Sequence, residues 1–441
     1  MAQIHWLDLV LAPLHWLEQA RGWRRLPLLG FYGVILSVGG VLVSREAMIW
    51  RLPDAPEPFD LAKYGHIDLA DSDNAMTFHD RAGQLLVADR GMYENEDRLF
   101  MGLFMRSQAD QWDWRRAGSK DQAWLASNRA ALDVWLAGTA CSDALLVQPE
   151  RLTASTPRTT VTRLRLLAHL GTLEATRRQA SGDLAGAWTY YRGVIRSGLH
   201  AARHAGFDPA IAGSGILRLA LPSVDGWGDE PGLSPELLRQ AVEDLKACRG
   251  LRTTTSDLIR MEYFVTRAEL EQMTANEFTR LGSDSPEWLN GWPPVSWVAR
   301  FARDEPRSSL KVFRLITAGR LAQADRPYLD RPLLISSPYL IYDVDASTPP
   351  QLAQIAPGTL AGWADSSNCR IVLIRNNWNQ FLQASALAGA DRLDSSQLRL
   401  AERAYKLDHG GRPAQVYGEL VPAYLDALPP TIEPGDPLAA P

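Results

Sequence analysis

Two histidines and a glutamate are the residues of this chain whose types and spacing come closest to chemistry. His200 and His204 stand four residues apart in a segment predicted to be helical, and this spacing lets two imidazoles ligate one zinc ion. The intervening residues are Ala-Ala-Arg, so the glutamate of the metalloprotease motif HExxH is missing. Glu262 lies among apolar residues in the run IRMEYF, where burial would raise its pKa. Two interpretations are possible: these residues form a metal or hydrolase site, or they are a packed histidine pair and a surface glutamate without a catalytic role.

Other candidates carry less chemistry. Cys141 lies in GTACSDALL, and the sequence identifies no partner that would activate its thiol. The run AGSGI at 212–216 is rich in glycine but lacks the lysine of a phosphate-binding loop, so it predicts a turn. The chain has no GxSxG, Walker, GxGxxG or kinase signature. We therefore assign no catalytic, cofactor-binding or metal-binding residue from the sequence, and favour a protein that is not an enzyme.

Composition sets the class of molecule. The chain has 441 residues, which is enough for two or three domains, and 46% of its residues are hydrophobic. Its net charge is −5 and it has no extended basic run, so nucleic acid is not expected as a partner. Three widely spaced cysteines, Cys141, Cys248 and Cys369, exclude a disulfide framework. The fifteen tryptophans are interpreted mainly as anchors in helix packing.

Residues 26–43 form the one segment suited to a lipid environment. This run, LPLLGFYGVILSVGGVLV, carries no charge, and as a helix it would be roughly 27 Å long, close to the hydrocarbon core of a bilayer. Arginines and tryptophans flank it on both sides. The alternatives are a buried core helix and a cleaved signal peptide, but no small-residue cleavage site follows the run. We predict a single-pass anchor that contacts the lipid bilayer through residues 26–43.

Charge flanking the run gives an orientation. Three arginines precede it, Arg21, Arg24 and Arg25, and two follow it, Arg45 and Arg51. The positive-inside rule then places the N-terminus in the cytoplasm and the C-terminal region on the periplasmic side of a bacterial inner membrane. Residues 1–25 are interpreted as a cytoplasmic amphipathic segment.

Periodicity after the anchor is mainly helical. Asp73 or Asn74 is expected to cap a helix, and 121–138 reads as a second helix. The clearest unit is a hairpin over 163–206, in which Gly182 ends one helix and Asp183 caps the next. Further helices are predicted at 209–221, after a Ser234 cap, and over 255–278, 308–324 and 378–407. Two strands are predicted, at 331–344 and 369–374.

The predicted fold is mostly α: an N-terminal transmembrane helix, then an irregular array of antiparallel helical hairpins, with few short strands. We divide the chain at composition shifts and turn-rich stretches. The predicted segments are 1–25 (cytoplasmic), 26–43 (anchor), 44–73 (linker), 74–280 (helical hairpins), 281–377 (loop-rich with short strands), 378–430 (long helix and closing motif) and 431–441 (disordered tail). In the closing motif, Gly410 and Gly411 stop the helix, and 416–428 offers an apolar helical face.

The hairpin over 163–206 resembles a tetratricopeptide unit at Gly182, Ala187 and Tyr191, without a regular 34-residue recurrence, so the array is degenerate. Several pieces together resemble a family of uncharacterised single-pass membrane proteins of planctomycete-type bacteria. These are the basic segment and anchor, the helix at Asn74, the run GDLAGAW at 182–188, LRQAVEDL followed by Glu262, and the tail GGRPAQVYGELVPAYLDALP. This resemblance implies a membrane location and a helical outer domain, and brings no activity with it.

The tail also resembles the segment after the long helix of type II secretion pseudopilins, through Ala404, Tyr405, Asp408, Gly410, Pro413 and Leu420. The pseudopilin processing site does not match, because Gly30 and Phe31 lie inside the apolar run. The sequence thus predicts a membrane-anchored helical protein that contacts a protein partner or organises the cell envelope. The alternatives are an envelope hydrolase or metalloenzyme and, third, a secretion component.

Overall fold

A computed structural model of the chain describes residues 56–87, 113–153, 156, 158–272, 306–322, 324, 389, 392–428 and 433–436, with eight positions between 30 and 43. The chain divides into two compact units, one made of 1–56, 273–319 and 332–374, the other of 57–272, 320–331 and 375–441. The described residues are mostly helical, as predicted, and the two predicted strands lie outside them.

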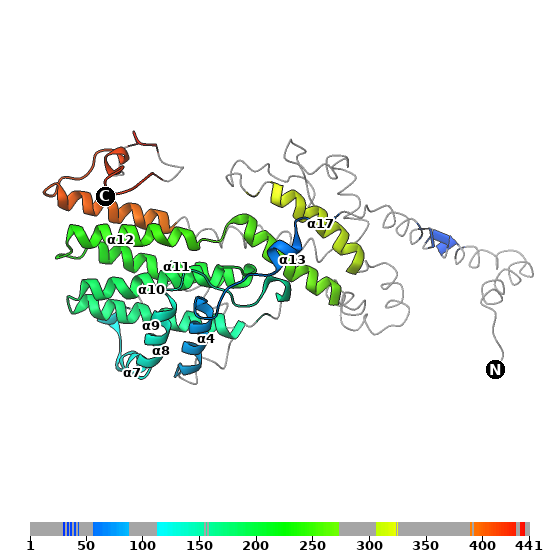
Figure 1. Cartoon of the computed structure of the whole chain (residues 1–441), viewed down its shortest axis with the longest axis horizontal. Coiled ribbons are helices and arrows are strands. Elements are labelled where there is room, and N and C mark those ends of the chain that lie inside the picture. The colour runs from blue at the N-terminus through cyan, green and yellow to red at the C-terminus, as the bar shows by residue number, and fades with distance from the viewer. Residues whose placement is uncertain are drawn as a thin grey trace, which may run out of the picture. The chain divides into compact units, whose positions relative to one another are not determined.

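Four helices form the body of the second unit: α9 (Arg158–Ala180), α10 (Leu184–Ala202), α11 (Phe207–Gly228) and α12 (Pro235–Ala247). They lie side by side in Figure 1, and α10 packs against both α9 and α11. The predicted hairpin is confirmed: Gly182 adopts φ +81°, and Asp183 caps α10 by accepting a hydrogen bond from Gly186 N. The Ser234 cap of α12 is confirmed as well.

Tryptophans hold these helices together. Trp135 is fully buried and donates from its indole N–H to Ser197 Oγ at 2.8 Å. Trp188 and Trp227 stack with ring centroids 5.0 Å apart, and each indole N–H has an acceptor, Asp244 Oδ2 and Leu184 O respectively. Because each ring contributes large apolar area and satisfies its polar atom, it fixes the spacing of two helices. The predicted role of tryptophan is confirmed for these three.

The run at 212–216 was predicted as a turn, and this is wrong, because it lies inside α11. Gly213 faces Gly198 of α10 so closely that a Cβ on Gly213 would lie 2.2 Å from Gly198 O. The glycines serve the crossing of two helices rather than a change of chain direction. The predicted helix at 209–221 is correspondingly longer at both ends.

The helix predicted over 121–138 is two helices, α7 (Ser119–Ser127) and α8 (Arg129–Gly138). Asn128 separates them, and its side chain both accepts from Val87 N at 2.7 Å and donates to Val87 O at 2.9 Å. A contact 41 residues away in sequence therefore interrupts a continuous helical pattern. Asn74, the predicted cap, begins α4 (Ala75–Leu85) and also bonds Leu145 in both directions.

The described part of the predicted linker is packed rather than extended. It contains α3 (Leu61–Gly65), capped by Asp60. Phe59 contacts Tyr263 and Phe264 edge to face, with centroids 5.4 and 5.6 Å apart. Both belong to α13 (Thr255–Gln272), the described part of the helix predicted over 255–278. Aromatic contacts therefore hold this segment in place. The contacting residues are about 200 positions apart in the sequence, so the periodicity of the linker could not reveal them.

A helix over 392–408, the described part of the one predicted over 378–407, lies along α12 in Figure 1. Arg252 forms a bidentate pair with Asp394, at 2.6 and 2.8 Å, and Arg239 pairs with Asp408 at 2.9 Å. Gly410 and Gly411 end the helix with φ values of +64° and +92°, as predicted.

The prediction of an apolar helical face over 416–428 is wrong, because this segment does not form an α-helix. The segment has one short 3-10 helix, η7 (Tyr417–Leu420), and then turns. Pro422 supplies no N–H, and Val421 before it is extended (ψ 136°), as residues before proline prefer. Leu420, Tyr424 and Leu425 are nevertheless buried, so the apolar contacts form without an α-helix.

The first unit is described at fewer positions. It holds helix α17 (Pro306–Ala322) as far as residue 319; this helix agrees with the one predicted over 308–324 and buries Leu310 and Phe313. None of the helices formed by the described residues is long and apolar enough to cross a bilayer. Most of 26–43 lies outside those residues, as do 1–25 and most of 431–441.

Candidate functional site

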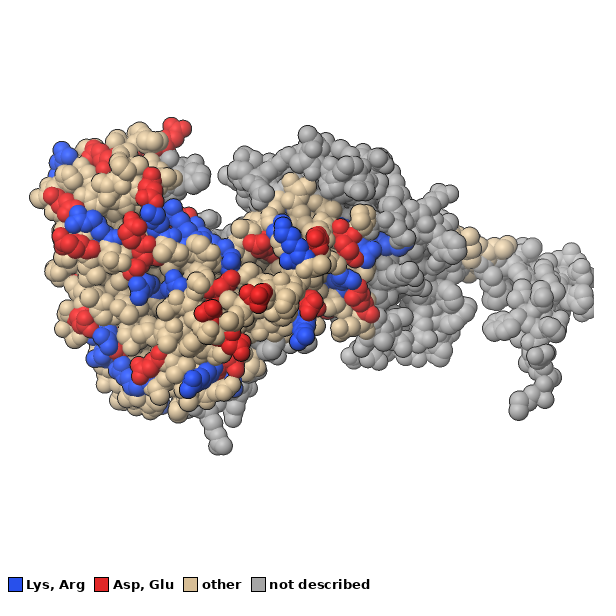
Figure 2. Space-filling view, in the orientation of Figure 1, with Lys and Arg blue, Asp and Glu red and all other residues tan. Residues whose placement is uncertain are grey.

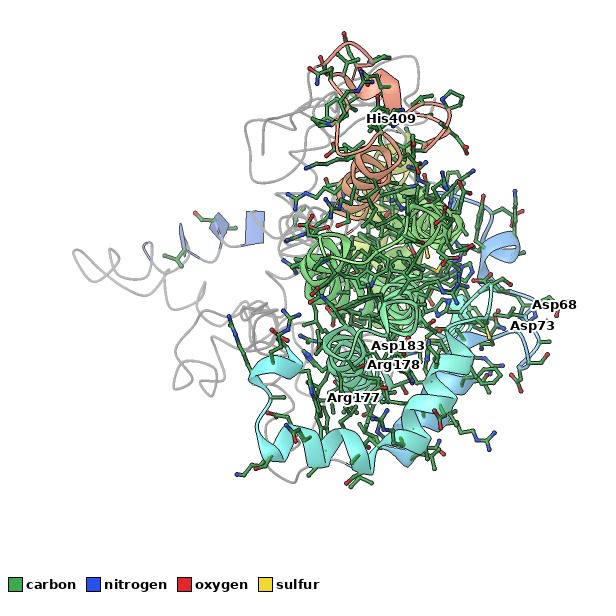
Figure 3. The ribbon with its side chains drawn as sticks, turned by 90° about the vertical axis from the view of Figure 1, so that its left-hand side faces the viewer. Asp68, Asp73, Arg177, Arg178, Asp183 and His409 are labelled. Atoms are coloured by element: carbon green, nitrogen blue, oxygen red, sulfur yellow. The ribbon has the colours of Figure 1, made fainter. Side chains whose placement is uncertain are left out.

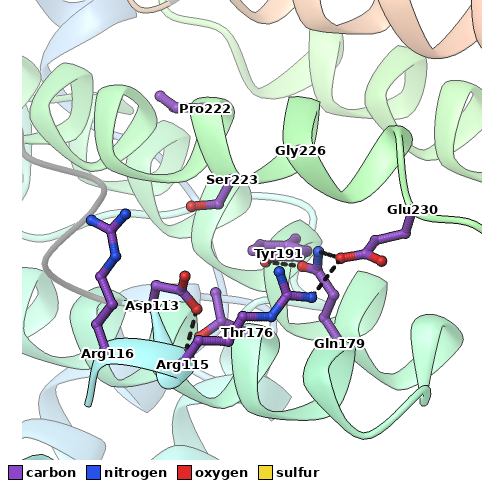
Figure 4. A pocket seen from close by; sticks show the side chains of 10 residues that line it. All are labelled: Asp113, Arg115, Arg116, Thr176, Gln179, Tyr191, Pro222, Ser223, Gly226 and Glu230. Carbon is purple, nitrogen blue, oxygen red and sulfur yellow. Dashed lines mark hydrogen bonds and ion pairs between the residues drawn. The ribbon is translucent and has the colours of Figure 1, made fainter. Parts of the chain in front are cut away.

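A polar pocket of about 240 Å³ opens where four elements of the second unit meet. Asp113 caps η3 (Trp114–Arg116) by accepting from Arg115 N at 3.0 Å. Thr176, in the last turns of α9, accepts from Trp114 N at 3.0 Å, which fixes η3 beside α9. Figure 4 shows Arg115 and Arg116 of η3 on one side of the pocket and α11 on the other.

The floor of the pocket is a chain of hydrogen bonds. Tyr191, fully buried on α10, donates its hydroxyl hydrogen to Gln179 Oε1 at 2.7 Å. Gln179 Nε2 donates in turn to Glu230 Oε1 at 2.7 Å, and Arg115 Nη2 donates to the same oxygen at 2.9 Å (Figure 4). The chain therefore ends on a carboxylate that also carries an ion pair.

Electrostatics at the floor are negative. Burial raises the pKa of Tyr191, the carboxylates of Asp113 and Glu230 raise it further, and Arg115 opposes them. Tyr191 is thus a neutral hydrogen-bonding group at any physiological pH.

Small side chains form the α11 side of the pocket. Pro222, Ser223 and Gly226 line the pocket, and a Cβ added to Gly226 would meet no atom within 4 Å. The lining carries two acidic and two basic side chains, so its formal charge is zero. Sequence reasoning identified Tyr191 only as a core residue of the hairpin and did not single out the pocket. Thr176 and Gln179 lie in the charged last turns of α9, beside Arg177 and Arg178, so nothing in their residue types or spacing marked them as pocket residues.

The residues singled out in the sequence do not converge. His204 is not on the helix that carries His200, because α10 ends at Ala202 and Arg203 is extended. His204 Nε2 lies 3.3 Å from Asp143 Oδ2, while His200 Nδ1 lies 3.2 Å from His79 Nε2. Among the described residues, no group of three His, Cys, Asp or Glu could hold a metal ion. His200 and His204 therefore do not share the helical face that the hypothesis of a zinc site requires.

His200 and His79 form a buried, neutral pair. His200 Nε2 contacts Cys141 O at 3.2 Å, and a carbonyl only accepts, so this nitrogen carries the proton. His200 Nδ1 is then an acceptor and His79 Nε2 donates to it. Burial, with Arg196 next, lowers the pKa of His200 to about 3, and burial beside His200 lowers that of His79.

Glu262 and Cys141 have structural contacts. Glu262 is half-buried on α13, and its Oε2 accepts from Phe207 N at 3.4 Å, at the start of α11. Burial and Asp73 raise the pKa of the Cys141 thiol, which disfavours the reactive thiolate. The Cys141 backbone carbonyl accepts from Arg196 Nη2 at 2.7 Å.

A second charged cluster stabilises the hairpin. Glu174 has a fully buried side chain and pairs with Arg129, Arg177 and Arg178 at 2.7 to 2.9 Å. Burial alone would raise its pKa, but hydrogen bonds from Arg177, Arg129 and Arg178 lower it to about 2. Arg178 also pairs with the cap Asp183 at 2.7 Å, and Figure 3 shows these side chains together near the turn.

No family model matches the chain, and neither the curated proteins nor the solved structures contain one similar to it. The planctomycete-type and pseudopilin resemblances therefore stay predictions. On the face that Figure 2 shows, charges of both signs are interspersed over the described residues. The expectation that nucleic acid is not a partner remains untested as well.

Proposed function

We propose that the protein is a membrane-anchored helical protein that contacts a protein partner at the cell envelope of a bacterium. The observation that carries this proposal is the exposure of three apolar side chains at helical positions of the run 26–43. Val34, Leu36 and Val43 are helical and 62%, 73% and 70% exposed. Exposed apolar side chains on an uncharged run of this length are unfavourable in water and favourable in lipid. Residues 26–43 would thus anchor the chain, with the helical unit on the periplasmic side.

We further propose that α9 to α12 form a degenerate array of the tetratricopeptide kind. Two observations support it: α10 packs between α9 and α11, and α9 also contacts α11, as successive hairpins do in such arrays. The tight Gly182–Asp183 turn is a third point of agreement. Arrays of this kind present extended surfaces to protein partners, and this is the reason for expecting one. No arrangement of the described residues favours the hydrolase alternative.

The experiment is affinity purification of the tagged full-length chain from detergent-solubilised membranes, with and without prior chemical crosslinking. We expect the same envelope protein to co-purify in repeated preparations, and more of it after crosslinking. Isolation of the chain alone under both conditions would contradict the proposal. The side of the membrane is tested with Lys120→Cys, at an exposed position of α7. A membrane-impermeant maleimide should label this variant in intact spheroplasts, and labelling only after lysis would reverse the orientation.

A further inference from the structure

We propose that the pocket between η3, α9, α10 and α11 binds a small zwitterion, one or two amino-acid residues long, through its ammonium and its carboxylate. This inference goes beyond the anchored function proposed above and does not depend on it. It rests on the division of hydrogen-bonding groups between the floor and the rim of the pocket.

The floor offers acceptors. The Tyr191 hydroxyl hydrogen is committed to Gln179, and the Gln179 amide is committed to Glu230. Among the described residues, neither the Tyr191 hydroxyl oxygen nor Glu230 Oε2 accepts a hydrogen bond, since both donors to Glu230 contact Oε1. Asp113 uses Oδ1 for Arg115 N, so its Oδ2 is also open to a ligand. An ammonium group has three N–H donors and no acceptor, and is the group that such a floor would hold.

The rim offers donors. Arg115 donates one N–H to Glu230, and its side chain is 60% exposed. A guanidinium has five N–H donors, so a ligand carboxylate can bind to the remaining ones. Arg116 is exposed too, and Figure 4 shows its side chain apart from the Arg115 guanidinium, with Asp113 between them. The two charges of the ligand would thus meet charges of opposite sign at different depths.

The charge balance and the volume restrict the ligand. Two carboxylates and two guanidinium groups line the pocket, so a ligand with a large net charge of either sign would meet repulsion as well as attraction. At ~30 Å³ for each water of liquid volume, the space of about 240 Å³ corresponds to roughly eight waters. An amino acid or a dipeptide fits that space, and a drug-sized ligand does not.

Gly226 provides a way to close the pocket. A side chain there would enter open space, so Gly226→Leu should occupy part of the pocket without disturbing α11. Gly215 lies in the same helix, does not line the pocket and also has no atom within 4 Å of an added Cβ. Gly215→Leu is therefore the matched control.

The test is isothermal titration of the purified full-length protein with L-alanine, L-alanyl-L-alanine, the N-acetyl form of the dipeptide and its C-terminal amide. We expect at least one of the two zwitterions to bind, and each capped form of the dipeptide to bind about tenfold more weakly or worse, since each cap removes one charge-assisted contact. Gly226→Leu should abolish binding and Gly215→Leu should retain it. Asp113→Asn, which keeps the shape of the site, should weaken binding about tenfold.

Absence of binding by both zwitterions to the folded wild-type protein would overturn the proposal. Capped and uncapped dipeptides of equal affinity would overturn it too, because the pocket would not be reading the charges. Binding that survives Gly226→Leu would place the ligand elsewhere. If Gly226→Leu does not fold, as judged by its melting temperature, the Asp113→Asn titration decides in its place.

Discussion

At the scale of single residues, this protein buries titratable groups that serve its interior. His79, His169 and His200 are all buried, and burial lowers the pKa of each, to about 3 for His169 and His200. A buried imidazole is stable in a helical core while it is neutral, and protonation would place an unsolvated charge there.

Stability should therefore fall as the pH is lowered from about 7 to about 5. The pKa values are lowered in the folded state, so below 6.5 the unfolded chain binds protons that the folded chain does not. For His169 and His200, whose pKa values are about 3, staying neutral removes about 2 kcal/mol of unfolding free energy each by pH 5. Urea unfolding at a series of pH values measures this. His200→Gln should show a shallower dependence on pH, and a wild-type stability that is flat over this range would contradict the burial of these imidazoles.

Glu174 offers a second prediction at this scale. Glu174→Gln keeps the shape of the side chain but leaves three arginines without their common counter-charge, and we expect it to destabilise the fold by about 2 kcal/mol. The difference from wild type should shrink as the pH falls from 4.5 towards about 2, where the wild-type carboxyl also becomes neutral. Denaturant unfolding checks both points. Glu236→Gln, which removes the exposed pair with Arg239, should behave like wild type, and equal effects of the two variants would contradict the role of Glu174.

At the scale of elements, the sequence predicts correctly those helix ends and turns that are determined by residues adjacent in the chain. The Gly182–Asp183 turn, the Asn74 and Ser234 caps and the Gly410–Gly411 ending follow from local backbone chemistry, and the structure agrees. The predictions are wrong where a contact between residues far apart in the sequence determines the local structure. Asn128 breaks a helix because it bonds Val87, and Phe59 fixes a supposed linker against α13. The pocket joins residues from 113 to 230, a grouping that periodicity cannot reveal.

The α10–α11 crossing gives a prediction at this scale. Gly213→Ala places a Cβ against Gly198 O, and we expect it to destabilise the fold by about 1–3 kcal/mol. Gly215→Ala, two residues away, meets open space and should be neutral or stabilising, because alanine is the better helix former. Thermal unfolding of the two variants compares them directly. Similar melting temperatures would contradict the close approach of the two helices.

At the scale of the whole molecule, we propose that residues 26–43 anchor a helical unit to a membrane. This run is uncharged and apolar, and Val34, Leu36 and Val43 within it are helical and exposed. An arginine near the centre of such a span costs about 3 kcal/mol, so two should abolish anchoring.

Alkaline carbonate extraction of membranes from cells that express the full chain is the most direct test. We expect the wild-type chain to stay in the membrane pellet and to be released only by detergent. The double variant Val34→Arg, Leu36→Arg should leave the pellet. Release of the wild-type chain into the carbonate supernatant would contradict the anchor.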